Sequence, residues 1–166
     1  MPAPPKDATP AELADWLEAM RRGIDLRLDS EGAWWHEGAP FAHAGLIAAF
    51  NRGLDVHPET GEAILRVGDR WCYVKCEGTP FLVRRLVPGA NGLQATLNTG
   101  ETYPVPPEGF ITRGAHVYVR LAPKREARLN RVTQARLAEW LIEGPDGLQV
   151  KTATGAWPVR VTEAGR

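Results

Sequence analysis

Two stretches of the chain share the pattern that decides the expected fold: GEAILRVGDRWCYV at residues 61–74 and GLQVKTATGAWPVR at residues 147–160. In each, a glycine stands ten residues before a tryptophan. An apolar residue follows the glycine after three positions (Ile64 or Val150), and another follows the tryptophan after two (Tyr73 or Val159). Glycine-containing turns between runs of alternating apolar and polar residues are typical of β-hairpins. The two stretches therefore indicate a repeated hairpin.

The segments before these hairpins repeat the same order of elements. The expected strands at 24–28 and 93–98 match in their apolar alternation, and each opens a hairpin. An expected helix follows, in the second case after an inserted strand at 116–121. The sequence thus predicts an α+β fold of two related hairpin–helix–hairpin halves formed by internal duplication. Each half is small for an independent core, so we expect the halves to bury apolar faces against each other and to leave a cleft between them.

Turn-forming residues divide the chain into three parts. The run Pro88-Gly89-Ala90-Asn91-Gly92 is the clearest linker. The predicted parts are an N-terminal arm and helix at 1–23, a first α+β half at 24–88 and a second α+β half at 89–166. We expect helices at 10–23, at about 41–54 and within 124–143, the last being strongest from 133 to 142.

The first of these helices has the clearest local signals. Thr9 and Glu12 form a capping box around Pro10. Its apolar residues recur at helical spacing and so share one face: Leu13, Trp16, Leu17 and Met20. This face either docks on the body of the protein or serves as an interface with a partner.

Composition and charge exclude several classes of protein. The chain has 166 residues with 43% hydrophobic and 24% charged residues, which is ordinary for a globular domain. Its 20 basic and 20 acidic residues balance, which argues against nucleic acid as a partner. No apolar run approaches the ~20 residues of a transmembrane helix, and the first residues lack the apolar region of a signal peptide. We therefore expect a cytoplasmic protein without a membrane span.

The reactive side chains show no pattern typical of catalysis or metal binding. The histidines lack ligand spacing, and two cysteines are too few for a closed zinc site. Cys72 and Cys76 lie in one expected strand, where ~13 Å would separate them, too far for a disulfide. Neither a phosphate-binding loop nor a nucleophile or metalloprotease motif is present. The sequence predicts neither a cofactor, a metal site nor enzymatic activity, and both cysteines are interpreted as structural.

A basic stretch stands out against an acidic first half. Residues 113–136 hold seven basic residues and one acid, whereas residues 7–62 hold eleven acids and four bases. The two regions either face each other, form solvated surfaces, or contribute an anion site. For an anion site the candidates are Arg120, Arg128 and Arg131, with Asn130 adding a hydrogen bond. Arg128 and Arg131 would share one face if this stretch is helical.

Aromatic residues suggest what else such a site would contain. Most of the six tryptophans are expected in the core. Trp34 and Trp35 are adjacent on an expected strand and must point to opposite faces. Trp34 and Phe81 are our candidates for apolar or stacking walls beside the arginines.

Several short motifs occur in the order found in one family. The stretches Gly32-Ala33-Trp34 and 38–50 (GAPFAHAGLIAAF) resemble elements of the bacterial domain of unknown function 1285 family, as do 77–81 (EGTPF), Tyr118-Val119-Arg120 and 126–131 (EARLNR). The resemblance covers roughly residues 24–160. It implies a duplicated α+β fold with a pleckstrin-homology-like second half, a nucleotide-type ligand between the halves and a role in signal transduction.

Two positions depart from the family pattern. His43 stands where the family usually has Arg, and residues 67–70 (VGDR) stand where it usually has a Thr-Pro-x-Glu stretch. His43 is therefore included among the ligand-binding candidates, and a family site at these positions would be altered or lost here.

Three hypotheses for function follow from these observations. The first is a non-catalytic regulatory module that binds a small anionic, nucleotide-like ligand between its halves. The second is a protein–protein adaptor that uses the N-terminal amphipathic helix or a sheet edge and has no small-molecule ligand. The third is an enzyme, which would require a cleft carboxylate or histidine with a strongly shifted pKa.

Overall fold

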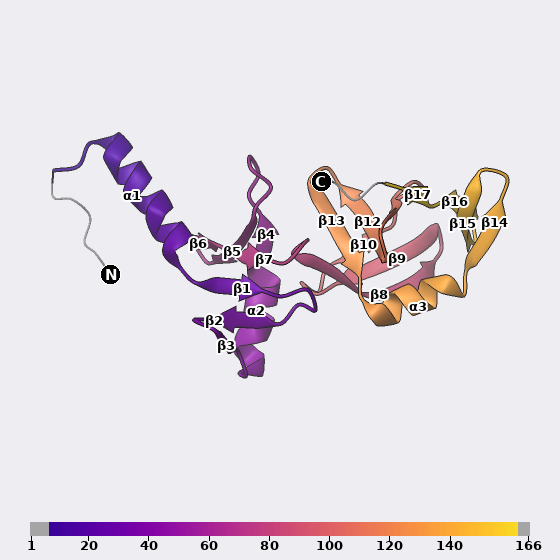
Figure 1. Cartoon of the computed structure of the whole chain (residues 1–166), viewed down its shortest axis with the longest axis horizontal. Coiled ribbons are helices and arrows are strands. Elements are labelled where there is room, and N and C mark those ends of the chain that lie inside the picture. The colour runs from indigo at the N-terminus through magenta and orange to yellow at the C-terminus, as the bar shows by residue number, and fades with distance from the viewer. Residues whose placement is uncertain (1–6, 163–166) are drawn as a thin grey trace.

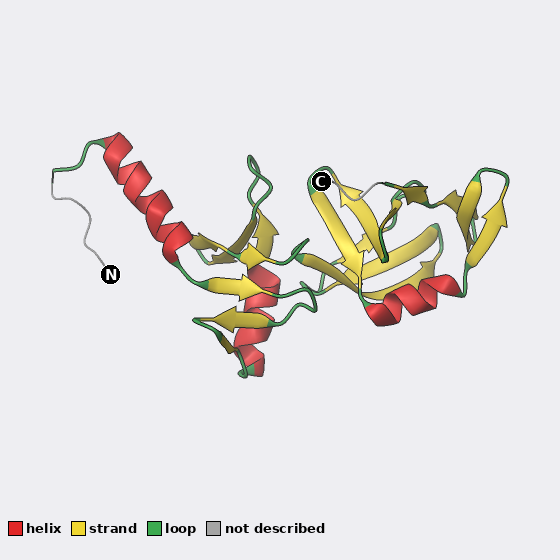
Figure 2. Ribbon diagram, in the orientation of Figure 1, coloured by secondary structure: helices red, strands yellow, loops and turns green. Residues whose placement is uncertain are grey.

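The computed structural model describes residues 7–162 and shows two lobes in a row, with a helix projecting from the first (Figures 1 and 2). Helices and strands mix throughout, so the α+β prediction is confirmed. The described helices are α1 (Pro10–Gly23), α2 (Ala44–Gly53) and α3 (Arg131–Ala138).

The first lobe contains two small sheets and α2. In one sheet β1 pairs antiparallel with β2 and parallel with β7, and β3 forms its edge. The other is an antiparallel meander of β4, β5 and β6. These strands are β1 (Leu26–Leu28), β2 (Trp34–His36), β3 (Ala39–Pro40), β4 (Leu54–Val56), β5 (Ala63–Val67), β6 (Arg70–Tyr73) and β7 (Lys75–Cys76).

The second lobe is built on a seven-stranded sheet in the order β10-β9-β8-β13-β12-β11-β17. A separate meander of β14, β15 and β16 follows α3. These strands are β8 (Phe81–Gly89), β9 (Gly92–Leu97), β10 (Thr102–Pro104), β11 (Phe110–Arg113), β12 (His116–Ala122), β13 (Arg125–Leu129), β14 (Leu141–Gly144), β15 (Gly147–Thr152), β16 (Gly155–Pro158) and β17 (Arg160–Val161).

The three predicted helices agree with the structure to different degrees. The first helix is confirmed with its capping box, since Glu12 N donates to Thr9 Oγ1 and Thr9 N donates to Glu12. The second helix begins at Ala44, with His43 as its N-cap. The third is much shorter than predicted, because residues 125–129 form β13 and residues 141–144 form β14. Burial alternates along β13, where Ala127 and Leu129 are buried, as a strand packed on one face requires.

The arrangement of β13 corrects the idea that Arg128 and Arg131 share a helical face. Arg128 lies on β13 opposite Tyr118 of β12 and Leu82 of β8, whereas Arg131 is the first residue of α3. The two arginines are brought together by the bend between a strand and a helix.

The predicted boundary at 88/89 falls inside the hairpin of β8 and β9. Val87 pairs with Gln94 and Gly89 with Gly92, so the glycine-rich run is a turn within the seven-stranded sheet. The sheets change between β7 and β8, about ten residues earlier in the chain than the linker at 88–92.

The lobes share an order of elements, because α2 and α3 are each followed by a three-stranded antiparallel meander. The registers of the matching hairpins differ. Ile64 pairs with Tyr73, nine residues on, whereas Val150 pairs with Trp157, seven residues on.

Most of the buried apolar residues of both lobes form one hydrophobic cluster. Leu28 and Trp34 contribute from the first lobe, and Phe81, Phe110 and Val119 from the second. The apolar association expected between the halves is therefore present.

Candidate functional site

A pocket of about 520 Å³ lies where β13 bends into α3, and we call it the corner pocket. It brings together three of the predicted site residues, Arg128, Asn130 and Arg131. Glu31 reaches it from the first lobe, so the pocket lies between the lobes. Its remaining lining residues come from the turn before β12, β12 itself, β13 and α3: Ala115, His116, Leu129, Gln134, Ala135 and Ala138.

Arg128 is the most buried charged side chain of the corner pocket. Its side chain is 13% exposed, and its Nη2 lies 3.8 Å from Oε1 of Glu31, whose side chain is 77% exposed. A contact of this length to an exposed carboxylate is weak. Arg128 is therefore held by its burial in the sheet, with its charge only partly balanced.

Asp29 organises the turn that carries Glu31 by accepting hydrogen bonds from three groups around it. Asp29 Oδ1 accepts hydrogen bonds from the backbone N–H groups of Glu31 and Ala33, and Oδ2 accepts one from Trp35 Nε1. Burial alone would raise the pKa of Asp29, but these hydrogen bonds hold the pKa below its ordinary value. Gly32, with φ of 81°, lies where a side chain would meet Arg84 and Leu82.

Asn130 has a structural role that sequence reasoning did not anticipate. It is the N-cap of α3, and its Oδ1 accepts hydrogen bonds from Thr133 N (2.8 Å) and Thr133 Oγ1 (2.9 Å). Thr133 Oγ1 also lies 3.0 Å from Val83 O on β8. The side-chain oxygen of Asn130 is thus occupied by the helix start, and the hydrogen bond to a ligand predicted from Asn130 would have to come from its amide nitrogen.

Arg131 is exposed and forms no ion pair within residues 7–162. Gln134, one turn further along α3, donates from Nε2 to Ala115 O at 2.8 Å and so fixes the helix to the turn before β12. The start of α3 is therefore fixed against the turn before β12. Among residues 7–162 no carboxylate pairs with the guanidinium of its first residue, Arg131.

The other predicted site residues lie away from the corner pocket. Trp34 is 1% exposed, and its Nε1 donates to Asn51 Oδ1 at 2.8 Å in the first-lobe core. Phe81 is fully buried beneath the guanidinium of Arg125, 4.8 Å from the ring centroid. His43 caps α2 by accepting from Leu46 N. None of these three lines a described pocket, because burial or capping occupies each of them.

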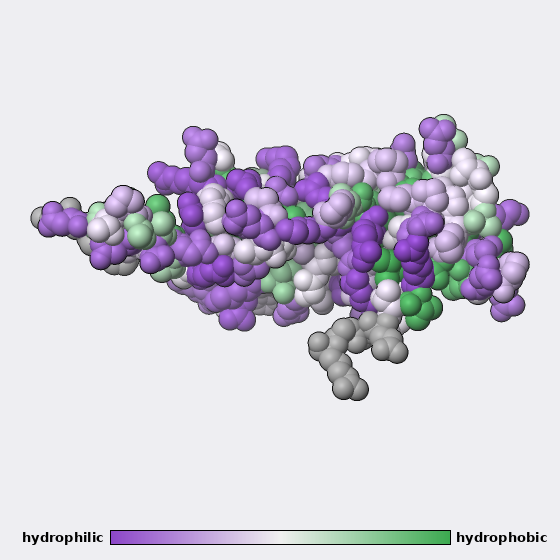
Figure 3. All heavy atoms as spheres, turned by 90° about the horizontal axis from the view of Figure 1, so that it is seen from above, coloured by the Kyte–Doolittle hydropathy of each residue, from purple (hydrophilic) through white to green (hydrophobic). Residues whose placement is uncertain are grey.

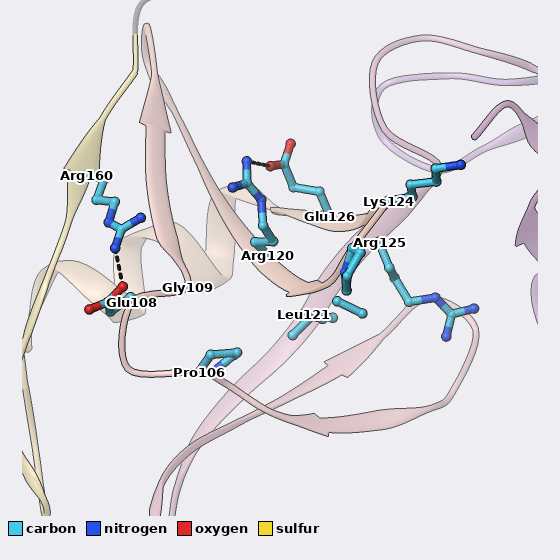
Figure 4. Close-up of a pocket in the computed structure, with 11 residues that line it drawn as sticks. Pro106, Glu108, Gly109, Arg120, Leu121, Lys124, Arg125, Glu126 and Arg160 are labelled. Carbon is cyan, nitrogen blue, oxygen red and sulfur yellow. Dashed lines mark hydrogen bonds and ion pairs between the residues drawn. The ribbon is translucent and has the colours of Figure 1, made fainter. Parts of the chain in front are cut away.

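Arg120 lines a second pocket of about 840 Å³, which we call the hairpin pocket because the β12–β13 hairpin forms much of its wall. In Figure 4 the guanidinium groups of Arg120 and Arg160 each turn to a carboxylate, that of Glu126 and that of Glu108. Arg113 forms two hydrogen bonds to Glu126 as well. Arg120 and Arg160, which face this pocket, are thus paired with carboxylates of the second lobe.

The end of the same hairpin joins the lobes. Arg125 donates to Asp55 Oδ1 at 2.9 Å, and Lys124 Nζ donates to the carbonyls of Pro58 and Glu59, both at 2.8 Å. Together with Arg128 and Glu31, these contacts confirm that part of the basic stretch faces the first half. Sequence reasoning missed Glu31 and His116 as pocket residues, since no local signal places them beside α3.

The thiols offer no reactive group. Cys72 is buried and Cys76 is half-buried, and both are unpaired. Burial raises the pKa of both, that of Cys76 to about 11, so the thiols remain protonated near neutral pH. The described residues contain no cluster of His, Cys, Asp and Glu suited to a metal ion. Among the described helices, none has the length and apolar character needed to cross a membrane.

The described residues form an α+β fold, which was compared with the folds and sequences of known proteins. No protein-family model matches the sequence, and neither does any curated protein. Two solved structures match. A DUF1285 family protein from Silicibacter pomeroyi DSS-3 matches with a TM-score of 0.65 and 17% identity, over 82% of this chain and 80% of that one. A DUF1285 family protein from Shewanella baltica OS155 matches with a TM-score of 0.55 and 17% identity, over 70% of this chain and 91% of that one.

The chain therefore has the fold of DUF1285 family proteins, as the order of its sequence motifs predicted. At this level of identity the likeness concerns the fold alone.

Proposed function

We propose that this protein is a non-catalytic regulatory module that binds a small anionic, nucleotide-like ligand in the corner pocket. The observation that carries the proposal is the convergence of Arg128 and Arg131 on one pocket between the lobes. Cytoplasmic location and a part in signal transduction belong to the same proposal. The location rests on the composition and the lack of a long apolar run in the sequence, and the signalling role rests on the sequence resemblance.

The charges of the corner pocket favour an anion over a neutral ligand. Arg131 has no ion-pair partner in the described part of the chain, and Arg128 has a distant one. A phosphate or carboxylate would gain charge-assisted hydrogen bonds from both guanidinium groups. The pocket is lined by the N-cap and the first residue of α3, Asn130 and Arg131, and the start of a helix favours negative charge.

The size and lining of the pocket restrict the ligand further. A volume of about 520 Å³ suits a small molecule. Trp34 and Phe81 are buried elsewhere, and the ring among the lining residues of the pocket is the exposed imidazole of His116. Recognition of a nucleotide here would thus depend on its phosphates and sugar more than on stacking of its base.

Calorimetric titration and thermal shift with ATP, cyclic AMP and inorganic phosphate test the proposal. A ligand at 100 times its dissociation constant should stabilise the wild type by ~2.7 kcal/mol. We expect Arg128→Ala and Arg131→Ala each to weaken binding by more than ~1.5 kcal/mol, which is about tenfold. Arg136→Ala is the matched control, because Arg136 is on α3, pairs with Glu139 and does not line the pocket. Equal affinity in all four proteins would remove the corner pocket as the site.

A protein–protein adaptor is the second candidate, and the exposure of α1 favours it. Leu13 and Leu17 are each 39% exposed, and no residue of α1 is buried. Binding of none of the three probes, together with capture of a partner that depends on Leu13 and Leu17, would favour the adaptor.

The origin of the two lobes by internal duplication, with a pleckstrin-homology-like second half, also remains part of the proposal. Its support is the shared order of a helix followed by a three-stranded meander, while the two-residue difference in hairpin register speaks against a close repeat.

A further inference from the structure

The turn between β1 and β2 carries a carboxylate from the first lobe into the corner pocket. Figure 1 shows this turn reaching from the first lobe toward the second. Hydrophilic side chains cover much of the molecular surface, as the face in Figure 3 shows, so an exposed charge by itself indicates no site. Glu31 differs from such charges because it lines the same pocket as the guanidinium groups of Arg128 and Arg131.

The backbone of this turn is held against the second lobe. Arg84 Nη2, on β8, donates to Glu31 O at 3.1 Å. Gly32 has φ of 81°, and a Cβ at this position would lie 2.7 Å from Arg84 Nη2 and 2.8 Å from Leu82 Cδ1. Glu31 N also donates to Asp29 Oδ1 at 2.9 Å. Hydrogen bonds and close packing therefore fix the backbone at Glu31.

The side chain of Glu31 is much less constrained than its backbone. It is 77% exposed, and its one ion pair among the described residues is the 3.8 Å contact between its Oε1 and Arg128 Nη2. The Arg128 side chain is only 13% exposed, so its guanidinium stays in place when Glu31 moves. Rotation of the Glu31 side chain into solvent therefore exposes the charge of Arg128 without any change in the backbone.

A carboxylate attached in this way competes with ligands of the same chemistry. Groups joined by a short chain have effective concentrations in the millimolar range. A ligand with a single carboxylate offers Arg128 the same group that Glu31 already offers, so at lower concentrations it does not replace Glu31. A phosphate with two negative charges gains more, because it also pairs with Arg131, whose guanidinium has no ion-pair partner within residues 7–162.

We propose that Glu31 is a tethered competitor for Arg128 and that it restricts the corner pocket to ligands with at least two negative charges, such as a phosphate dianion or a diphosphate. Two charges balance both guanidinium groups, whereas a monocarboxylate balances one. The inference rests on the proposed function, since it defines the ligand class of the same pocket.

Calorimetric titration of the full chain with inorganic diphosphate and with acetate, at about pH 8 and constant ionic strength, tests the proposal. We expect the wild type to bind diphosphate and to show no acetate binding in the same concentration range. Glu31→Gln should bind diphosphate about three- to fivefold more tightly, because the ligand no longer displaces a partly exposed ion pair. Acetate that binds the wild type as tightly as diphosphate overturns the proposal.

Glu31→Asp separates competition from a general effect of charge. Aspartate keeps the negative charge, but its side chain is one methylene shorter and does not reach Arg128 from the same fixed backbone. Competition predicts that this variant gains as much affinity as Glu31→Gln, whereas simple repulsion of the ligand predicts no gain. A gain confined to Glu31→Gln therefore overturns the proposal. Glu143→Gln is the control for a lost charge elsewhere and should behave as wild type, because Glu143 is exposed on β14 and lies outside the pocket.

Arg128→Ala distinguishes failure of this proposal from failure of the proposed function. In that background Glu31 has no guanidinium to compete for, so adding Glu31→Gln should leave diphosphate affinity unchanged. Equal affinity of the wild type and Glu31→Gln, with weaker binding by Arg128→Ala, overturns the competitor and keeps the pocket as an anion site. Absence of diphosphate binding to both the wild type and Glu31→Gln overturns both proposals.

Discussion

The interior of the molecule and the surface where its lobes meet are held together by different physics. Inside, a continuous apolar cluster runs through both lobes and includes the fully buried rings of Trp34, Phe81 and Phe110. At the surface, the β12–β13 hairpin contacts the first lobe through charged groups, with Arg125 on Asp55 and Lys124 on two backbone carbonyls.

These two kinds of contact contribute differently to stability and to ligand binding. Apolar burial is non-directional and stabilises the fold as a whole, whereas charged hydrogen bonds depend on geometry, pH and salt. Residues predicted as ligand walls because they are aromatic, Trp34 and Phe81, belong to the interior. Those predicted because they are basic reach a pocket, and of these Arg128, which is 13% exposed, and the exposed Arg131 keep charge that is not fully paired among the described residues.

The largest effect should come from the interior. Trp34→Ala removes a fully buried ring that also packs edge-on against Phe50, with centroids 5.3 Å apart. We expect a loss of about 3 to 5 kcal/mol in the free energy of unfolding, measured by urea denaturation. A loss below about 1 kcal/mol together with reduced ligand binding would show that Trp34 contributes to the binding site more than to the apolar interior.

The next effect concerns the contact between lobes. Arg125→Ala removes the hydrogen bond to Asp55 from a side chain that is only 19% exposed, and the contact with the hydroxyl of Tyr103. We expect a loss of about 1.5 to 3 kcal/mol, smaller at high salt. A double-mutant cycle with Asp55→Ala isolates the pair. Zero coupling between the two substitutions would show that the charged contact does not join the lobes.

A smaller effect separates capping from ligand binding at Asn130. Asn130→Ala should lower the free energy of unfolding by about 1 kcal/mol, because α3 loses its N-cap. Asn130→Asp keeps the cap, so stability should stay near wild type while phosphate affinity falls through the added negative charge. Equal stability of the alanine variant and the wild type would mean that the cap is dispensable.

The smallest effect is a pH dependence at the turn that carries Glu31. The pKa of Asp29 lies below its ordinary value, so the ionised carboxylate stabilises the folded state above an ordinary pKa of about 4. This contribution is lost as pH falls through the lowered folded-state pKa. Asp29→Asn should therefore lose less stability than wild type between about pH 5 and about pH 3 in pH-dependent urea unfolding. Parallel curves would exclude Asp29 as the source.

Local patterns predicted the elements whose causes are local. The capping box of Thr9 and Glu12 marked the start of α1, and alternation marked β1 and β12. Pro104 ends β10, and this proline fits the place of the strand at the edge of the sheet. Ordered motifs along the chain indicated the shared fold with DUF1285 family proteins. These signals act over a few residues, so the sequence carries them without the tertiary structure.

Only the tertiary structure decided which residues meet. Residues 125–129 form a strand because β8, more than forty residues earlier, pairs with them in parallel, with Ala127 opposite Phe81. That pairing turns Arg128 toward Glu31 and places Arg131 at the start of α3. It also buries Phe81, and packing within the first lobe buries Trp34. Contacts between distant segments leave no periodic trace in either segment, which is why the sequence identified the arginines but not the pocket they share.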